Sequence, residues 1–92
     1  MDIIYNYKFE KQIIQIIDYI AKDKPSASKR YVQELEKLIL TIPKNPFKYK
    51  QSSYFNDKNI RDMTYKGYTI IYEVNFKEDF IEVLKIFNRN KP

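Results

Sequence analysis

The spacing of apolar residues changes along this chain, and each change predicts a new element of structure. Asp2 to Tyr7 alternates isoleucine and tyrosine with polar residues, a short pattern that is typical of a strand. From Phe9 the apolar residues recur at intervals of three and four positions, which predicts an amphipathic helix running to about Ala21.

A second helix follows a break at residues 23–26. Pro25 is well tolerated in a first helical turn, and Asp23 or Ser26 can accept hydrogen bonds from the amides there. This helix must end before Pro43, because the residue preceding a proline is pushed out of the helical region. Two helices joined by so short a link are expected to pack antiparallel, as a hairpin. The apolar face of the second helix consists of Ala27, Tyr31, Leu35, Leu38, Ile39 and Ile42.

The last third of the chain has the short apolar runs of a sheet. Three strands are predicted, at Ile60 to Tyr65, Tyr68 to Asn75 and Phe80 to Asn88. Lys66-Gly67 forms a two-residue turn between the first two, where glycine supplies the positive φ that a tight hairpin requires. The last strand has apolar residues on both faces, which indicates a central position in the sheet.

Pro43 to Asn59, between the helices and these strands, has no period that fits a helix or strand and is predicted to be a long loop. The predicted order is therefore strand, helix, helix, strand, strand, strand. We expect one α+β domain over residues 1–92, with two layers: a helical hairpin packed on one face of an antiparallel sheet.

Composition removes several kinds of chemistry. The chain has no cysteine and no histidine, so it offers no disulfide, no thiolate metal site and no histidine for acid–base work. No cofactor is expected. No apolar run approaches the length of a membrane span, and the first residues lack the order of a secretory signal, which favours a cytoplasmic location.

The positive charge is concentrated in the middle of the chain. The net charge is +5, and residues 22–66 carry 11 basic and 5 acidic side chains. Such an excess favours acidic partners, including nucleic acid, through long-range attraction and counterion release. A lysine-rich solvated surface without a partner is the alternative interpretation.

Phrases along nearly the whole chain resemble the RelE/ParE superfamily of type II toxins, and within it the ParE-like side. They are IIDYIAKDKPSASKRYVQELEKLI in the helices, Pro46 in the loop, IRDMTYKGYTIIYEV in the strands and the closing VLKIFNRNKP. The resemblance implies a small bacterial toxin held inactive by a cognate antitoxin. RelE-like members cut messenger RNA on the ribosome, whereas ParE-like members act on DNA gyrase, and the fold alone does not decide between them.

The residues favour the second action. RelE-like nucleases commonly place an arginine where this chain has Thr69, and often carry a histidine or tyrosine near or after the last strand, whereas no tyrosine follows Tyr72 here. We therefore expect a ParE-like toxin that inhibits its target, DNA gyrase, by binding. The alternatives are a ribosome-dependent mRNA endonuclease and a non-toxic module that only binds an antitoxin.

Two arginines match the superfamily's recurrent basic positions, Arg61 at the start of the first hairpin strand and Arg89 after the last strand. If the protein is a nuclease, the catalytic candidates are Arg61, Arg89 and Lys58. If it binds a target, both arginines are expected to lie along one groove with Lys58, Lys66 and Lys85, because guanidinium groups bind phosphate or carboxylate through two hydrogen bonds. The full set of expected target-binding residues is Lys48, Tyr49, Lys50, Arg61, Lys66, Lys85 and Arg89. The structural alternative for Arg61 is an ion pair with a nearby carboxylate, such as Glu82.

The nine tyrosines allow two interpretations. Tyr49, Tyr54 and Phe55, in the lysine-rich loop, could stack on unpaired bases. Tyr31, Tyr68 and Tyr72 fall at periodic positions and are expected in the core. Apolar residues exposed on the helical hairpin or along an edge strand would give an antitoxin its anchoring groove, and free toxin could self-associate through the same surface.

Overall fold

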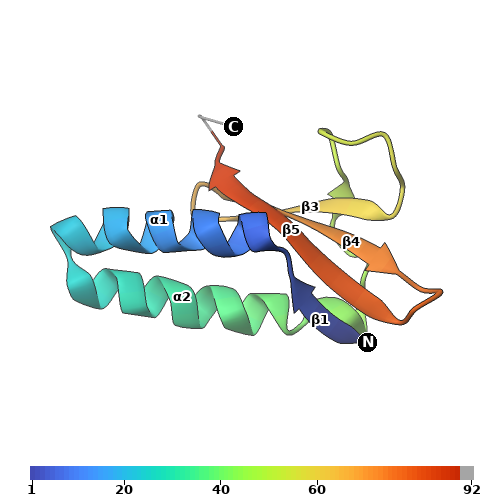
Figure 1. Cartoon of the computed structure of the whole chain (residues 1–92), viewed down its shortest axis with the longest axis horizontal. Helices are drawn as coiled ribbons and strands as arrows, with labels where there is room; N and C mark the ends of the chain where they lie inside the picture. The colour runs from blue at the N-terminus through green and yellow to red at the C-terminus, as the bar shows by residue number, and fades with distance from the viewer. Residues whose placement is uncertain (90–92) are drawn as a thin grey trace.

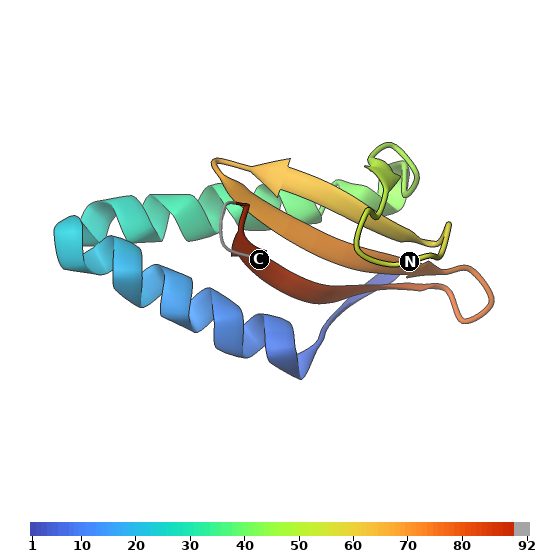
Figure 2. The same cartoon turned by 90° about the horizontal axis from the view of Figure 1, so that it is seen from above.

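The computed structural model describes residues 1–89 as two α-helices, one short 3-10 helix and five strands. The elements in chain order are β1 (Asp2–Tyr5), α1 (Tyr7–Asp23), α2 (Pro25–Ile39), the short 3-10 helix η1 (Ile42–Lys44), β2 (Lys50–Gln51), β3 (Ile60–Tyr65), β4 (Tyr68–Asn75) and β5 (Phe80–Asn88). The helices lie side by side against the sheet, and their connection extends beyond one end of it (Figures 1 and 2). The α+β fold with two layers is confirmed.

The strands form one sheet in the order β1-β5-β4-β3-β2. β2, β3, β4 and β5 pair antiparallel with their neighbours, whereas β1 pairs parallel with β5. The prediction of a purely antiparallel sheet was therefore wrong at this edge. β1 and β5 are far apart in sequence, and a parallel pair needs such a long connection, here supplied by the helices and the other strands.

The first helix begins earlier than the apolar spacing predicted. Asn6 caps α1, because its side-chain oxygen accepts a hydrogen bond of 2.8 Å from the amide of Lys8. The side-chain nitrogen of Asn6, Nδ2, donates to Glu82 Oε2 at 2.9 Å, which ties the start of the helix to β5. α1 continues to Asp23, and only Lys24, in an extended conformation, separates it from α2.

The three predicted C-terminal strands are confirmed, as is the turn at Lys66 and Gly67, whose φ angles are 47° and 86°. Positive φ at both turn residues suits the right-handed twist of a two-residue hairpin. The predicted loop, by contrast, includes most of η1 and the whole of β2. Lys50 and Gln51 of β2 pair with Asp62 and Arg61 of β3 and extend the sheet by one short edge strand.

The core lies between the helices and one face of the sheet. Its members are buried side chains from α1, α2, η1 and the three long strands: Phe9, Tyr31, Leu35, Ile39, Ile42, Met63, Ile70, Tyr72, Val74, Ile81, Val83 and Ile86. Tyr31 and Tyr72 are buried as predicted, and Tyr68 packs half-buried against this core. β5 occupies the predicted interior position, between β1 and β4.

Candidate functional site

The face of the sheet that points away from the helices carries most of the polar chemistry. Met63, Ile70 and Ile86 lie opposite one another in register and pack in the core. Because side chains alternate along a strand, their neighbours point to the other face, which we call the open face. The open-face residues of β3, β4 and β5 are Asp62, Thr64, Thr69, Ile71, Lys85 and Phe87.

A polar hollow of about 320 Å³, the cationic hollow, lies on the open face. It is lined by Lys50, Ser53, Tyr54, Asp62, Thr64, Thr69 and Arg89. Lys50 comes from β2 and Arg89 directly follows β5, where its amide donates to the carbonyl of Gly67 at 2.9 Å. Two cations and several hydroxyl groups therefore converge on one hollow, a set of groups suited to binding an anion.

A second hollow of about 320 Å³ lies on the same face. It is lined by Gln12, Tyr54, Phe55, Ile71, Lys85 and Phe87, so Tyr54 belongs to both hollows. The ring of Tyr54 packs edge-on against Phe87, with 5.1 Å between the ring centroids. Lys85 is the cation of this second hollow.

Hydrogen bonds fix the loop that carries Tyr54. Asp62 Oδ2 accepts from the amide of Ser53 at 2.9 Å and from its hydroxyl at 3.1 Å. The hydroxyl of Ser52 accepts from the amide of Tyr54 at 3.1 Å. The other oxygen of Asp62, Oδ1, is buried and has no hydrogen-bond partner in the described part of the chain. Asp62 thus holds the loop with one oxygen, while the second is buried and has no partner among the described residues.

The structure places Arg61 away from the open face. Arg61 pairs in register with Tyr72, a core residue, so its side chain leaves the sheet on the opposite side from that of Asp62. Its Nε and Nη2 donate to the carbonyl of Lys58 at 3.0 and 2.8 Å, and its Nη1 donates to the carbonyl of Tyr49 at 3.1 Å. The guanidinium carbon lies 4.6 Å from the ring centroid of Phe47. Arg61 therefore ties together both ends of the loop around β2.

Arg61 and Arg89 accordingly do not share a groove. Within the described residues, the guanidinium of Arg61 donates to backbone carbonyls, so its structural role differs from the ion pair with Glu82 considered above. Lys58 contributes its carbonyl to this contact while its side chain is exposed.

The remaining sequence-predicted residues fall into two groups. Lys50 and Lys85 join Arg89 on the open face. Lys48 and Tyr49 lie near Arg61, with Lys48 Nζ 5.6 Å from the ring centroid of Tyr49, and Tyr49 packs edge-on against Tyr72. Three of the seven predicted target-binding residues thus lie around the two hollows.

Lys66 has a partner on the helical layer. Its Nζ lies 3.0 Å from Oε2 of Glu34, and the hydroxyl of Tyr65 donates to the same carboxylate oxygen. The link joins α2 to the β3–β4 turn. It places Lys66 on the side of the sheet that the helices cover, apart from Lys50, Lys85 and Arg89.

The contribution of this link to stability is expected to depend on pH. Hydrogen bonds from Tyr65 and Lys66 lower the pKa of Glu34 below its ordinary value of 4.5. The charged Glu34 carboxylate therefore stabilises the fold fully above pH 4.5, and this stabilisation is lost as pH falls through the lower pKa of the folded state. Hydrogen bonds with Glu34 raise the pKa of Tyr65 and of Lys66, so their contributions are lost only as pH rises through values above 10.0 and 10.5. Glu34→Gln should therefore lower the thermal midpoint slightly at neutral pH and not at all in strong acid, with Glu78→Gln as the control. A difference that persists in strong acid would contradict a role for the Glu34 charge.

Sequence reasoning missed several open-face residues. Ser53, Thr64 and Asp62 were not singled out, and Thr69 was noted only for the arginine it replaces. The alternation of side chains in β3 could have identified two of them, because Asp62 and Thr64 alternate with Met63 and the half-buried Tyr65. The contribution of Ser53 depends on how the loop folds back, which no local pattern encodes.

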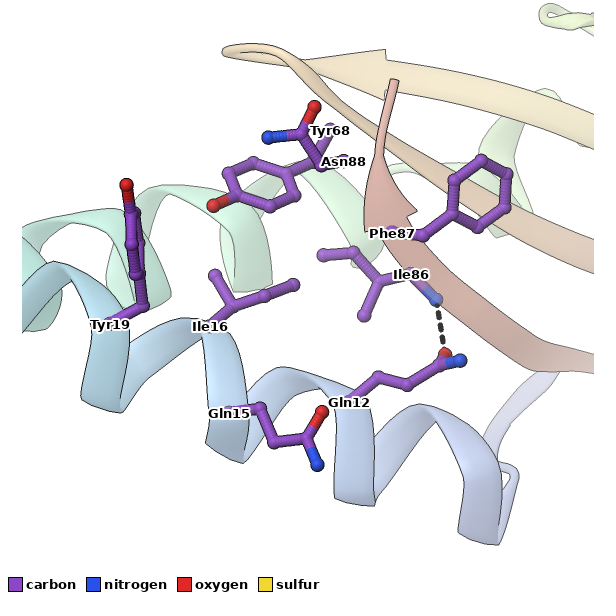
Figure 3. Close-up of a pocket in the computed structure, with 8 residues that line it drawn as sticks. All are labelled: Gln12, Gln15, Ile16, Tyr19, Tyr68, Ile86, Phe87 and Asn88. Atoms are coloured by element: carbon purple, nitrogen blue, oxygen red, sulfur yellow. Dashed lines mark hydrogen bonds between the residues drawn. The ribbon is translucent and has the colours of Figure 1, made fainter. Parts of the chain in front are cut away.

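A third hollow, of about 420 Å³, lies between α1 and the end of the sheet (Figure 3). It is lined by Gln12, Gln15, Ile16, Tyr19, Tyr68, Ile86, Phe87 and Asn88. β1 pairs only with Phe80 to Val83, so the following part of β5 has no neighbouring strand on that side. There, Gln12 Oε1 accepts from the amide of Ile86 at 2.9 Å (Figure 3). A side chain of α1 thus occupies the place of a strand.

Two further properties concern residues 1–89 alone. Within this range no group of three acidic, histidine or cysteine side chains is arranged to hold a metal ion. None of the helices described there is long and apolar enough to cross a membrane.

Comparisons with known proteins agree with this fold. The family model described as "ParE toxin of type II toxin-antitoxin system, parDE" matches residues 3–91. A solved structure described as the chromosomal ParDE TA system from P. aeruginosa superposes with a TM-score of 0.75, covering 96% of this chain and 95% of that one at 15% sequence identity. At this identity the structural likeness shows the fold alone. No curated protein sequence matches the chain.

Proposed function

We propose, from the premise that this chain belongs to the ParE toxin family of type II toxin–antitoxin systems, that it arrests growth by binding and inhibiting DNA gyrase. The family match covers nearly the whole chain and identifies the kind of protein. The target and the mode of action are the proposed part. They are supported by the chemistry of the open face.

The hydrogen bonds and burial of the Asp62 carboxylate favour target binding over RNA cleavage. Ribosome-dependent RNA cleavage needs a group that takes the proton from the 2′-hydroxyl. Lys50 and Arg89 are cations at neutral pH and can stabilise negative charge but do not readily accept a proton. Asp62 is a carboxylate in the same hollow, but one oxygen holds Ser53 and the other is buried. The cationic hollow is therefore better suited to binding than to general-base catalysis.

The hollow of Figure 3 is the site we assign to an antitoxin. It combines a strand position beside β5, now occupied by the side chain of Gln12, with the apolar surface of Ile16, Tyr19 and Tyr68. An extended segment placed there could take over the hydrogen bond that Gln12 now makes to Ile86, as a partner does when it adds a strand to a sheet. Tyr19 is 71% exposed and offers a large apolar contact to such a segment.

Expression of the protein without an antitoxin tests the proposal in cells. We expect growth to stop, incorporation of labelled thymidine to fall before that of labelled methionine, and co-expression of the antitoxin to restore growth. If methionine incorporation falls first and messages are cut within codons, the protein acts on the ribosome instead. Continued growth at a high level of folded protein would leave only the non-toxic, antitoxin-binding alternative.

A further inference from the structure

The two open-face hollows share one wall, and that wall is an aromatic ring. Tyr54 lines both the cationic hollow and the hollow that contains Lys85, and its side chain is 48% exposed. Lys50 and Arg89 belong to the hollow on one side of the ring, and Lys85 to the hollow on the other. Across the open face, positive charge, an aromatic ring and positive charge thus follow one another in space.

The groups of a single-stranded nucleic acid follow one another in a complementary order. Its phosphates repeat along the backbone, and each unpaired base offers a flat surface for stacking. Arg89 and Lys50 can bind one phosphate and Lys85 the next, while the hydroxyl group of Thr64 adds a neutral donor. Tyr54, between them, is placed to stack on the intervening base.

The position of Tyr54 is fixed before any ligand binds. Its amide is bonded to Ser52, its neighbour Ser53 is bonded twice to Asp62, and its ring contacts Phe87. A ring that is already ordered loses little conformational entropy on stacking, so most of the stacking energy appears as affinity.

The aromatic ring favours a nucleotide over a simple anion. Inorganic phosphate and the carboxylates of an acidic peptide offer charge to Lys50 and Arg89 but no flat surface to Tyr54. Asp62 takes no part in this contact, because its Oδ2 holds Ser53 and its Oδ1 is buried.

We infer that the open face is a binding site for single-stranded nucleic acid, with Lys50 and Arg89 on one phosphate, Lys85 on the next and Tyr54 stacked on the base between them. The inference goes beyond gyrase inhibition and does not depend on the identity of the toxin's target. It concerns binding alone and includes no cleavage step.

Fluorescence anisotropy with the full chain and labelled six-nucleotide single strands of DNA and RNA tests the inference. Both probes should bind more tightly than a twelve-base-pair duplex or a hexaglutamate peptide, and excess inorganic phosphate should compete poorly. Since three cations meet the backbone, a plot of log K against log salt concentration should have a slope of about −2. Equal binding of the duplex or of hexaglutamate would overturn the inference.

Two variants with matched controls assign the binding to this face. Tyr54→Leu should weaken binding by about 5-fold to 150-fold, the usual range for loss of one stacked base, whereas Tyr7→Leu on α1 should not. Arg89→Ala should make the salt slope shallower by about 0.7, whereas Lys77→Ala in the β4–β5 turn should leave it unchanged. Circular dichroism and the thermal midpoint verify that each variant is folded. Folded Tyr54→Leu protein that binds as tightly as wild type would contradict the assignment, whatever the outcome of any gyrase assay.

Discussion

Replacing Ile81 with alanine is expected to lower the free energy of unfolding by about 2–5 kcal/mol. Ile81 is fully buried in β5, where it pairs with Ile3 of the edge strand on one side and with Val74 of β4 on the other. Truncating its side chain leaves a cavity between the sheet and the helices. A domain of this size is stable by only about 5–15 kcal/mol, so the loss is a large part of the total.

Urea denaturation followed by circular dichroism measures this effect. Ile14→Ala is the matched control, because Ile14 is 57% exposed on α1 and alanine is the better helix former. The control should leave the free energy of unfolding unchanged or slightly higher. Equal losses for the two variants would show that the core does not lie where the structure places it.

Replacing Arg61 with alanine is expected to cost about 2 kcal/mol of stability and to loosen residues 47–59. The substitution removes three hydrogen bonds to the carbonyls of Lys58 and Tyr49. Only the bond to Tyr49 is partly buried and is worth about 1.5–3 kcal/mol as a bond to a charged group, whereas water can replace the two exposed bonds to Lys58. It also removes the contact with Phe47. Arg61→Lys should recover little of the loss, since an ammonium group cannot reach both carbonyls as the planar guanidinium does.

Hydrogen exchange distinguishes this structural role from direct contact with a target. Amides of the loop should exchange faster in Arg61→Ala, while those of α1 should not, and Arg30→Ala on the exposed side of α2 should leave both unchanged. If Arg61→Ala abolishes toxicity while stability and loop exchange stay as in wild type, Arg61 contacts the target as the sequence suggested.

Much of the fold was predictable because its signals are local. The period of three and four marks both helices, and the lone glycine beside Lys66 marks the tight turn between β3 and β4. The parallel pairing of β1 with β5 was not predictable, because it depends on where the chain returns after some 75 residues. β2 was missed because two residues carry no period.

The candidate site shows the same division between local and non-local signals. Alternation from Met63 correctly places Arg61 on the core side and Asp62 on the open face. In β5, simple alternation from Val83 would have placed Lys85 in the core. The register shifts beside Leu84, so that Ile71 pairs with Lys85 and Tyr72 with Val83. This bulge turns Lys85 to the open face, and only the pairing with β4 reveals it.

The central claim is that this toxin acts by binding gyrase, and the most direct measurement is the supercoiling of relaxed plasmid DNA by purified gyrase in the presence of the full chain. Supercoiled product is expected to disappear as the protein approaches the concentration of gyrase, and prior addition of the antitoxin is expected to restore it. Full supercoiling in a large excess of correctly folded protein would contradict the claim.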